Sequence, residues 1–574
     1  MKRIFLILVS ILLSLSMILS SCNDAKTPTT PTNQSTPKVD PDPDPDPEPE
    51  PDPELHTVSY GYMPERLSNE IKSLFEVTPV GASFGSVSLS SSPFAPADVF
   101  TISDCKVTSI TIPVYKTLAA DKDGNFIFTI HVISNVLEDM RKTPIAAHAV
   151  KINAQQYNLT ENTTTLKYIT VDLTEYNIVL TEKQSLAFCD KADTLVPAYL
   201  KTSSSTVAGD KLKKDFGVTC MYINVGKSTL VYDRDSFFFD FTFEKTYESK
   251  AAYDAVVEAE EAAEAEYERM LRVVAANYKG KYLSLLGDSI STFDGVTNNV
   301  KISSTMTNHR CYYRSSLLPD YTYTYWGRLQ METQMKLCVI NGWSSSKVYG
   351  GGQGADNKVD ATKDNLLVRA SQLHTNEGRT PDLVIIYMGI NDTRSSPSSI
   401  QHDSSKSNYT RNKTAGDLYA RLTKQNSGKT EYEIVDEWFR EVKKMANEAG
   451  KSIVPGKTYN TWEGAYALSI ETILKSYNNP EIFCMTLIRN HHAAATEILV
   501  NRSNVLIRAI ANYFGVGIIE QDNSEITMDN CHVYGADENE TVTSLHPNIK
   551  GHEMTTRLIV RTLYEHIQKK NNNQ

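Results

Sequence analysis

The chain has 574 residues, of which 40% are apolar and 22% are charged, and its formal net charge at neutral pH is −11. This length exceeds what one ordinary hydrophobic core holds, so we expect at least two domains. Nine acidic residues and two lysines between residues 23 and 54 account for −7 of the charge, and no basic stretch stands elsewhere in the sequence. The charge distribution therefore argues against nucleic acid as a partner.

The N-terminus has the composition of a targeting segment. Lys2 and Arg3 precede an apolar run over residues 4–19, and Leu19-Ser20-Ser21-Cys22 follows. That tetrapeptide resembles a bacterial lipobox, whose cysteine is lipidated and becomes the first residue after cleavage. We therefore expect a lipoprotein signal peptide at residues 1–21 and a lipid anchor on Cys22 that holds the protein in the bacterial cell envelope, at the outer membrane or cell surface. The alternative, an uncleaved membrane anchor, requires a longer apolar run.

Residues 22–54 are expected to form a tether. From residue 41 onward, proline alternates with aspartate or glutamate, which opposes core formation and favours extended, self-repelling geometry. At about 3.1 Å per residue, this acidic stretch alone reaches on the order of 40 Å.

Residues 55–244 alternate short β-prone runs with turn clusters. Valine, isoleucine, threonine, tyrosine and phenylalanine dominate runs such as 107–114, 125–133, 166–173 and 236–243. This pattern predicts an all-β sandwich, with a jelly-roll-like topology as the expected arrangement. The sequence does not distinguish a glycan-binding module from a simple spacer, because no aromatic binding platform is recognisable in it.

Residues 245–279 are rich in alanine and glutamate and predict one long linker helix. Its glutamates are expected to form a solvated face, and Gly280 is expected to end the helix.

From residue 280 to 574 the pattern changes to strands that alternate with helices. Five apolar runs read as strands, and they cover residues 282–286, 336–340, 383–388, 482–487 and 516–519. Helices are expected at 324–335, 432–449, 495–513 and 548–570. These elements predict a doubly wound, flavodoxin-like α/β domain with a mainly parallel sheet.

The cysteines and histidines do not predict a metal site. Seven cysteines remain besides Cys22, widely spaced and without a C-x-x-C pair, so neither a disulfide framework nor a zinc site is indicated. His491 and His492 are adjacent, and adjacent residues on a helix point in different directions.

Three short motifs follow the predicted strands in order. They are Gly287-Asp288-Ser289 after the first strand, Gly389-Ile390-Asn391-Asp392 after the third, and His546-Pro547-Asn548 before the last helix. Together they resemble blocks I, III and V of the SGNH (GDSL) hydrolases over about residues 280–570. The stretch Asn341-Gly342-Trp343-Ser344-Ser345-Ser346 is similar to block II.

This resemblance implies an esterase that needs no cofactor. Ser289 would be the nucleophile and His546 the base, since a serine hydroxyl needs a neighbouring group to take its proton. The oxyanion would be bound by the backbone N–H groups of Ser289 and Ser345 and by the side chain of Asn391, which follows the turn at Gly389. Asp288 and Asp392 are expected to be structural.

The sequence departs from the family at two positions. Ser345 stands where the family has a glycine, and serine tolerates fewer backbone conformations. Thr543 stands where the family has the acid that orients the histidine. The orienting partner of His546 would then be a backbone carbonyl, water, Thr543 itself, or an acid such as Asp537, Glu538 or Glu540.

The sequence therefore predicts a lipid-anchored serine esterase whose ester substrate is an acylated glycan, with removal of O-acetyl groups as the expected reaction. A lipase or thioesterase is a second enzymatic interpretation. A third is a non-catalytic, glycan-binding surface lipoprotein with a degenerate active site, and the residues at 345 and 543 are the features that favour it.

Overall fold

The computed structural model of the chain describes residues 54–572 apart from the gaps given next. The gaps are 63–66, 71, 74–93, 99–103, 135–142, 163–165, 191–192, 202–219, 225–229, 238–239, 298–310, 314–317, 345, 349–365, 394–415, 425–427, 449–460, 489–493, 528–533 and 535–545. The predicted signal peptide, Cys22 and the tether up to residue 53 lie outside the described residues.

Two antiparallel sheets make up the N-terminal part of the described chain. The strands of the first are β1 (His56–Gly61), β13 (Asp240–Tyr247), β3 (Cys105–Thr117), β6 (Lys167–Asp172), β7 (Ile178–Leu180) and β9 (Leu195–Pro197). Those of the second are, in spatial order, β10 (Tyr199–Lys201), β12 (Leu230–Phe237), β11 (Cys220–Asn224), β2 (Phe94–Asp98), β8 (Gln184–Phe188), β4 (Asn125–Ser134) and β5 (Ala146–Asn153).

One hydrophobic core joins these two sheets. Val107 and Ile110 of β3 and Phe126 and Phe128 of β4 are fully buried members of it. Buried residues alternate with partly buried ones in the first part of β3 and at the start of β4, whereas six consecutive residues later in β4 are buried. The predicted antiparallel β structure is confirmed, whereas the sandwich with jelly-roll topology stays a prediction.

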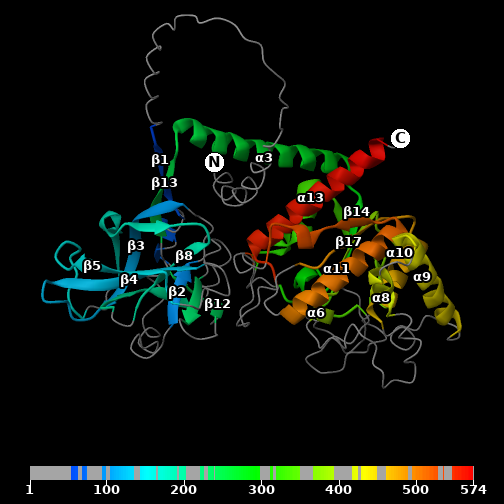
Figure 1. The fold of residues 1–574 in the computed structure, drawn as a ribbon, viewed down its shortest axis with the longest axis horizontal. Coiled ribbons are helices and arrows are strands. Elements are labelled where there is room, and N and C mark those ends of the chain that lie inside the picture. Colours follow the sequence, from blue (N-terminus) through cyan, green and yellow to red (C-terminus); the bar gives the residue numbers. More distant parts are fainter. Residues whose placement is uncertain are drawn as a thin grey trace, which may run out of the picture.

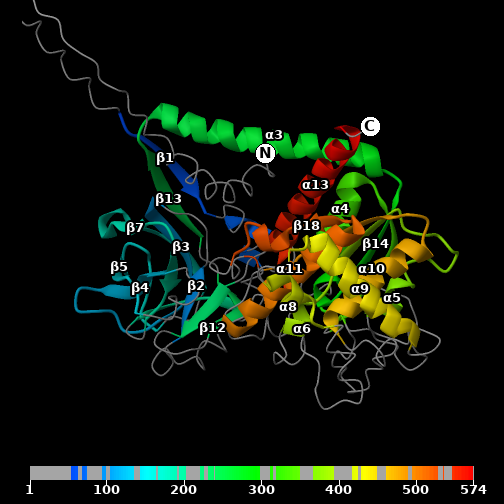
Figure 2. The same ribbon diagram turned by 45° about the vertical axis from the view of Figure 1, so that its right-hand side comes forward.

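The long helix α3 (Lys250–Tyr278) connects the antiparallel sheets to the rest of the chain. The hydroxyl of Ser249 caps its first turn by accepting the N–H of Ala252 at 3.1 Å. Figures 1 and 2 show α3 running across both halves of the molecule, from β1 and β13 to the C-terminal helix. It lies within the segment predicted as a helix, residues 245–279, and begins five residues after the predicted start.

A five-stranded parallel sheet forms the C-terminal part. Its strands are, in spatial order, β15 (Lys336–Gly342), β14 (Tyr282–Gly287), β16 (Leu383–Tyr387), β17 (Glu481–Met485) and β18 (Gly517–Ile519). Every pairing between neighbours is parallel. The first strand in sequence is flanked by the second and third, so all carboxyl ends reach one edge, where open α/β sheets place their ligands. The predicted parallel sheet is confirmed.

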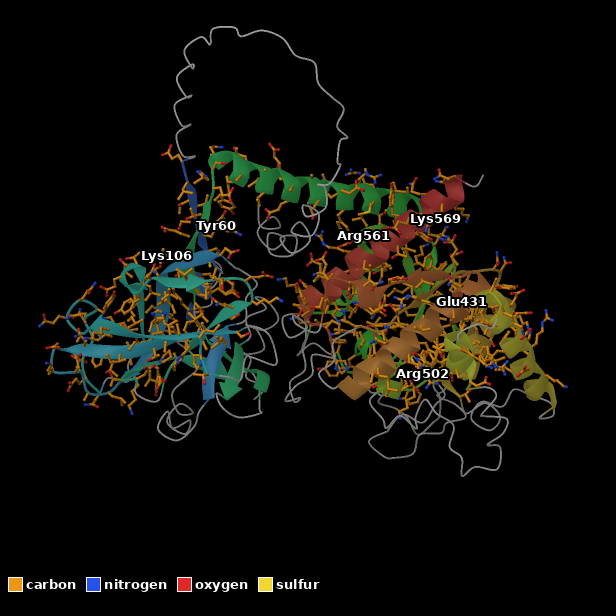
Figure 3. The ribbon with its side chains drawn as sticks, viewed as in Figure 1. Tyr60, Lys106, Glu431, Arg502, Arg561 and Lys569 are labelled. Atoms are coloured by element: carbon orange, nitrogen blue, oxygen red, sulfur yellow. The ribbon has the colours of Figure 1, made fainter. Side chains whose placement is uncertain are left out.

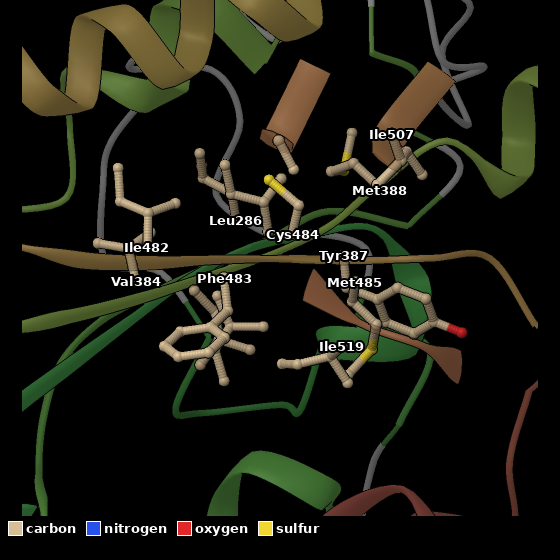
Figure 4. Close-up of a cluster of buried hydrophobic side chains, with 14 of the residues drawn as sticks. Leu286, Val384, Tyr387, Met388, Ile482, Phe483, Cys484, Met485, Ile507 and Ile519 are labelled. Carbon is tan, nitrogen blue, oxygen red and sulfur yellow. The ribbon is translucent and has the colours of Figure 1, made fainter. Parts of the chain in front are cut away.

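Helices cover this sheet on both faces, and Figure 4 shows buried side chains on either side of its strands. Ile482 and Cys484 lie on one side and Phe483 and Met485 on the other, as the alternation along a strand requires. The helices are α4 (Tyr325–Thr333), α5 (Leu366–Ala370), α6 (Ile390–Thr393), α8 (Leu418–Thr423), α9 (Glu431–Glu448), α10 (Trp462–Ser476), α11 (Ala494–Phe514) and α13 (Ile549–Asn572). The sequence prediction included α4, α9, α11 and α13 but not α10.

Candidate active site

The turn after β14 presents Ser289. Strand β14 ends at Gly287, and a short 3-10 turn over Ser289–Ser291 follows at once. The carboxylate of Asp288 accepts the N–H of Ile290 at 3.0 Å and so caps this turn. A Cβ on residue 287 would lie 2.1 Å from Ser291 Oγ, which no side chain tolerates. Glycine at 287 therefore lets the turn fold back tightly on the strand end.

Ser289 and His546 meet at the carboxyl edge of the sheet although 257 positions separate them. Ser289 Oγ and His546 Nε2 are 2.7 Å apart, which is hydrogen-bond distance. Both residues are buried, with exposed fractions of 2% and 7%. The predicted nucleophile and base thus have the geometry that proton transfer requires.

Asn391 lies beside them on α6, which follows β16. The backbone of Gly389 takes a φ of +127°, a conformation that side chains other than glycine rarely adopt, and a Cβ there would lie 3.2 Å from Trp462. Beyond this turn, Asn391 Nδ2 donates a hydrogen bond to the carbonyl oxygen of Ser346 at 3.1 Å. A side-chain amide has two hydrogens, so Asn391 can hold the loop that contains Ser346 and still offer an N–H to an oxyanion.

Several predicted positions fall in the gaps of the structure. Ser345, expected to supply a backbone N–H to the oxyanion, lies outside the described residues, although Ser346 beside it is described. Thr543, the three candidate acids from 537 to 540, and the pair at 491 and 492 lie outside them too. The roles assigned to Ser289, His546, Asn391, Ser345 and Gly389 stay predictions.

Two buried aspartates flank the site, and both accept backbone N–H groups, which fits the structural role expected for them. Burial raises the pKa of Asp288 to about 6, although the N–H of Ile290 and the charges of His546 and Arg369 act in the opposite direction. Burial also raises the pKa of Asp392, whose Oδ2 accepts the N–H of Val348 at 3.1 Å. Asp392 thereby fixes the end of the block II loop next to Asn391.

Arg369 is a residue that the motifs did not reveal. Its side chain is fully buried on α5, and it donates to the carbonyl oxygens of Gly287, at 2.5 Å, and of Asn341. It also donates to Asn341 Oδ1 at 2.8 Å and to Ser346 Oγ at 3.1 Å. One guanidinium therefore joins the end of β14, the end of β15 and the block II loop. The sequence around position 369 carries no recognisable signal for this role.

The described residues contain neither a metal-binding cluster nor a membrane-spanning helix. Among them, no group of three or more histidine, cysteine, aspartate or glutamate side chains is arranged to hold a metal ion. No helix within the described ranges is both long and apolar enough to cross a membrane.

A parallel α/β sheet with serine and histidine paired at its carboxyl edge is an arrangement typical of serine hydrolases. Residues 281–496 match the family model of GDSL-like lipases and acylhydrolases, so this part of the chain is a domain of that family. The matched segment contains Ser289 and Asn391 and ends before His546. The predicted family resemblance is confirmed.

Among curated proteins, none matches the chain. Solved structures similar to it include a protein from Bacteroides ovatus described as a GDSL-like lipase, at 19% identity and a TM-score of 0.29, covering 50% of this chain and 100% of its own. Another is Est24, a carbohydrate acetylesterase from Sinorhizobium meliloti, at 14% identity and a TM-score of 0.24, covering 50% and 99%. A third is a catalytic mutant of Axe2, an acetylxylan esterase from Geobacillus stearothermophilus, at 14% identity and a TM-score of 0.25, covering 50% and 95%.

Proposed function

We propose that the protein is a serine esterase that hydrolyses ester bonds through an acyl-enzyme on Ser289. The observation that carries this proposal is the 2.7 Å separation between Ser289 Oγ and His546 Nε2 at the carboxyl edge of the sheet. Two further features support it: the tight turn that Gly287 permits, and the Asn391 amide held beside the block II loop.

The reaction follows from these positions. His546 accepts the hydroxyl proton of Ser289 as Oγ attacks the ester carbonyl, and the negative charge moves to the carbonyl oxygen. The side-chain amide of Asn391 and the backbone N–H groups of Ser289 and Ser345 would stabilise that oxyanion. When the tetrahedral intermediate collapses, the leaving alcohol takes the proton from His546. Water then attacks the acyl-enzyme in the same manner and regenerates Ser289.

For the substrate, we propose O-acetyl groups on carbohydrate. The support is architectural: a β-rich accessory part is joined to the hydrolase domain by α3, and a tether with the lipobox-like Cys22 precedes both. This combination suits an enzyme that works on polymers at the cell envelope. Cells grown with labelled palmitate should then incorporate the label into the protein, and Cys22→Ala should abolish that labelling; equal labelling of both proteins, or labelling of neither, would contradict the lipid anchor.

The function is tested with an aryl acetate and the chain from residue 55 onward, beside Ser289→Ala and His546→Ala. Turnover by the unsubstituted chain that both substitutions abolish supports the esterase. Acetylated oligosaccharides and long-chain aryl esters then separate the carbohydrate esterase from a lipase. Equal background rates in all three proteins would contradict the proposal and favour the glycan-binding alternative, for which binding of oligosaccharides would be measured.

A further inference from the structure

The imidazole of His546 is covered on one face by an aromatic ring that no motif predicted. The rings of Tyr312 and His546 are nearly parallel, with centroids 3.4 Å apart and an angle of 8° between their planes. Turning the imidazole about its bond to Cβ would force one ring into the other. The stack therefore restricts His546 to orientations that keep its ring in one plane, the plane from which Nε2 reaches Ser289.

The backbone of Tyr312 is tied to the turn that carries the nucleophile. Tyr312 N–H donates to Thr292 Oγ1 at 2.8 Å, and the hydroxyl of Thr292 donates to the carbonyl oxygen of Ser289 at 2.7 Å. Thr292 is fully buried, so its bond to Ser289 is shielded from water, and its bond to Tyr312 is partly buried. A single hydroxyl thus links the backbone of Tyr312 to that of Ser289.

Tyr313, the next residue, contacts the segment that carries His546. The hydroxyl of the buried Tyr313 donates to the carbonyl oxygen of Pro547 at 2.7 Å, directly after His546 in the chain. The ring of Tyr313 also meets His546 edge-on, with centroids 6.2 Å apart and an angle of 83°. Residues 312 and 313 therefore contact both the turn of Ser289 and the segment of His546.

We propose that Tyr312 is a positioning residue that fixes the imidazole of His546 against Ser289, an inference that rests on the proposed esterase function. The face of the Tyr312 ring also attracts the positive charge that His546 acquires when it takes the proton of Ser289, because the face of an aromatic ring carries partial negative charge. The contact does not depend on an acid at position 543, where the sequence has threonine. Tyr312 thus performs part of the orienting task that the family assigns to that acid.

The test compares Tyr312→Phe and Tyr312→Leu in the full chain, with an aryl acetate as substrate. Phenylalanine keeps the stacked ring, so kcat should stay within about twofold of the unsubstituted protein. Leucine removes the ring, and kcat should fall on the order of tenfold to a hundredfold while KM stays within about twofold, since misplacement of a catalytic group costs rate. Tyr321→Leu is the matched control, because Tyr321 stacks on Trp326, at 5.7 Å and 17°, and does not contact His546.

Substrate binding separates positioning of the base from a general effect on the site. In a chain that already carries Ser289→Ala and so does not turn the substrate over, Tyr312→Leu should leave the dissociation constant of the aryl acetate within about twofold, because a residue that acts through His546 orients the base and does not hold the substrate. Binding that weakens by about tenfold or more, or a loss of kcat with Tyr312→Phe as large as with Tyr312→Leu, overturns the inference. Thermal unfolding of each variant shows whether a loss of rate reflects a loss of folded protein.

A fluorophosphonate probe distinguishes failure of this inference from failure of the proposed function. The probe reacts with an activated serine without any ester turnover. If the unsubstituted chain is labelled at Ser289 but does not hydrolyse esters, the esterase proposal fails, and slower labelling of Tyr312→Leu still supports the positioning role. Labelling of Tyr312→Leu at the unsubstituted rate overturns the inference. Absence of both labelling and hydrolysis overturns both proposals.

Discussion

Gly389 combines two restrictions that make substitution there costly. Its φ is +127°, and a Cβ would meet the indole of Trp462 at 3.2 Å. Gly389→Ala should lower the free energy of unfolding by about 1–3 kcal/mol and reduce turnover, because Asn391 stands two positions further along the same turn. Gly378→Ala is the control: its φ is +77° but no atom lies within 4 Å of the added Cβ. Urea unfolding and aryl acetate turnover measure both, and equal losses of activity would contradict the assignment.

Glu463 makes stability depend on pH. It is fully buried on α10, 3.3 Å from Arg502, and burial raises its pKa to about 7 from an ordinary value of 4.5. Above pH 7 the folded protein must hold the ionised carboxyl, and below about pH 4.5 the group is protonated whether or not the chain is folded. Its burial therefore lowers stability at high pH, and that cost disappears as the pH falls from about 7 to 4.5.

Glu463→Gln removes this titration. The unfolding free energy of the variant relative to the unsubstituted protein should rise between pH 4.5 and pH 8, by on the order of 3 kcal/mol, since a shift of one pKa unit is equivalent to about 1.4 kcal/mol. Urea unfolding of both proteins at the two pH values provides the measurement. A difference that stays constant with pH would show that Glu463 does not titrate in this range.

At the scale of single residues, motifs in the sequence singled out Ser289, Asn391 and His546. The structure brings Ser289 and His546 to 2.7 Å and joins Asn391 to Ser346, while the catalytic roles of these residues stay predictions. Arg369 and Tyr312 were not predictable, because their roles depend on which segments the fold brings together. A buried arginine and a stacked tyrosine have no local spacing that distinguishes them from surface residues.

At the scale of elements, α10 shows why a helix can be missed when secondary structure is predicted from sequence. Ten of its residues, Trp462–Ile470 and Ile473, are buried, and nine of these are consecutive. Helix prediction relies on an apolar stripe alternating with a polar one, and a helix buried on all sides has no such stripe. The amphipathic helix α9, in contrast, was found within one residue at each end.

The short helix α5 holds the strand ends together through Arg369. Arg369→Met keeps the length of the side chain but leaves the carbonyl oxygens of Gly287 and Asn341 without this donor, and buried acceptors that lose a partner cost about 1–3 kcal/mol each. The free energy of unfolding should fall by about 3 kcal/mol or more, and turnover should fall with it. Arg379→Met is the control, because Arg379 makes a solvent-exposed contact to the Tyr282 hydroxyl, and its change in stability should stay below about 1 kcal/mol. Comparable losses in both variants would contradict the role of Arg369.

Helix α3 belongs to both parts of the molecule. At its start, Tyr253 packs between the rings of His56 and Tyr247, at 5.0 and 5.2 Å. Figure 3 shows Tyr60 of β1 beneath this end and Arg561 of α13 near the other. Toward its C-terminus the residues Tyr267, Met270, Val274 and Tyr278 are buried in the core of the hydrolase domain. The segment predicted as a linker thus contributes its C-terminal turns, from Tyr267 to Tyr278, to that core.

A fragment that begins at residue 249 should therefore be more stable than one that begins at residue 280. The shorter fragment loses four buried side chains of α3, and large buried apolar side chains contribute about 1.5–3 kcal/mol each. It also loses the ion pair of Glu264 with Arg557, at 3.0 Å, and the hydrogen bond from the Tyr267 hydroxyl to Glu332, at 2.7 Å. Thermal unfolding of the two fragments provides the comparison, and equal midpoints would contradict the shared core.

Because α3 is one continuous helix, the number of its residues sets the orientation of the antiparallel sheets relative to the hydrolase domain. Each residue added between Tyr253 and Glu264 would turn the antiparallel sheets by about 100° around the helix axis and move them about 1.5 Å further away. Seven added residues would restore the original orientation to within about 20°, with the two parts about 10 Å further apart. The distance between the accessory part and the edge that carries Ser289 can therefore change with little reorientation only for particular numbers of added residues, of which about seven is the smallest.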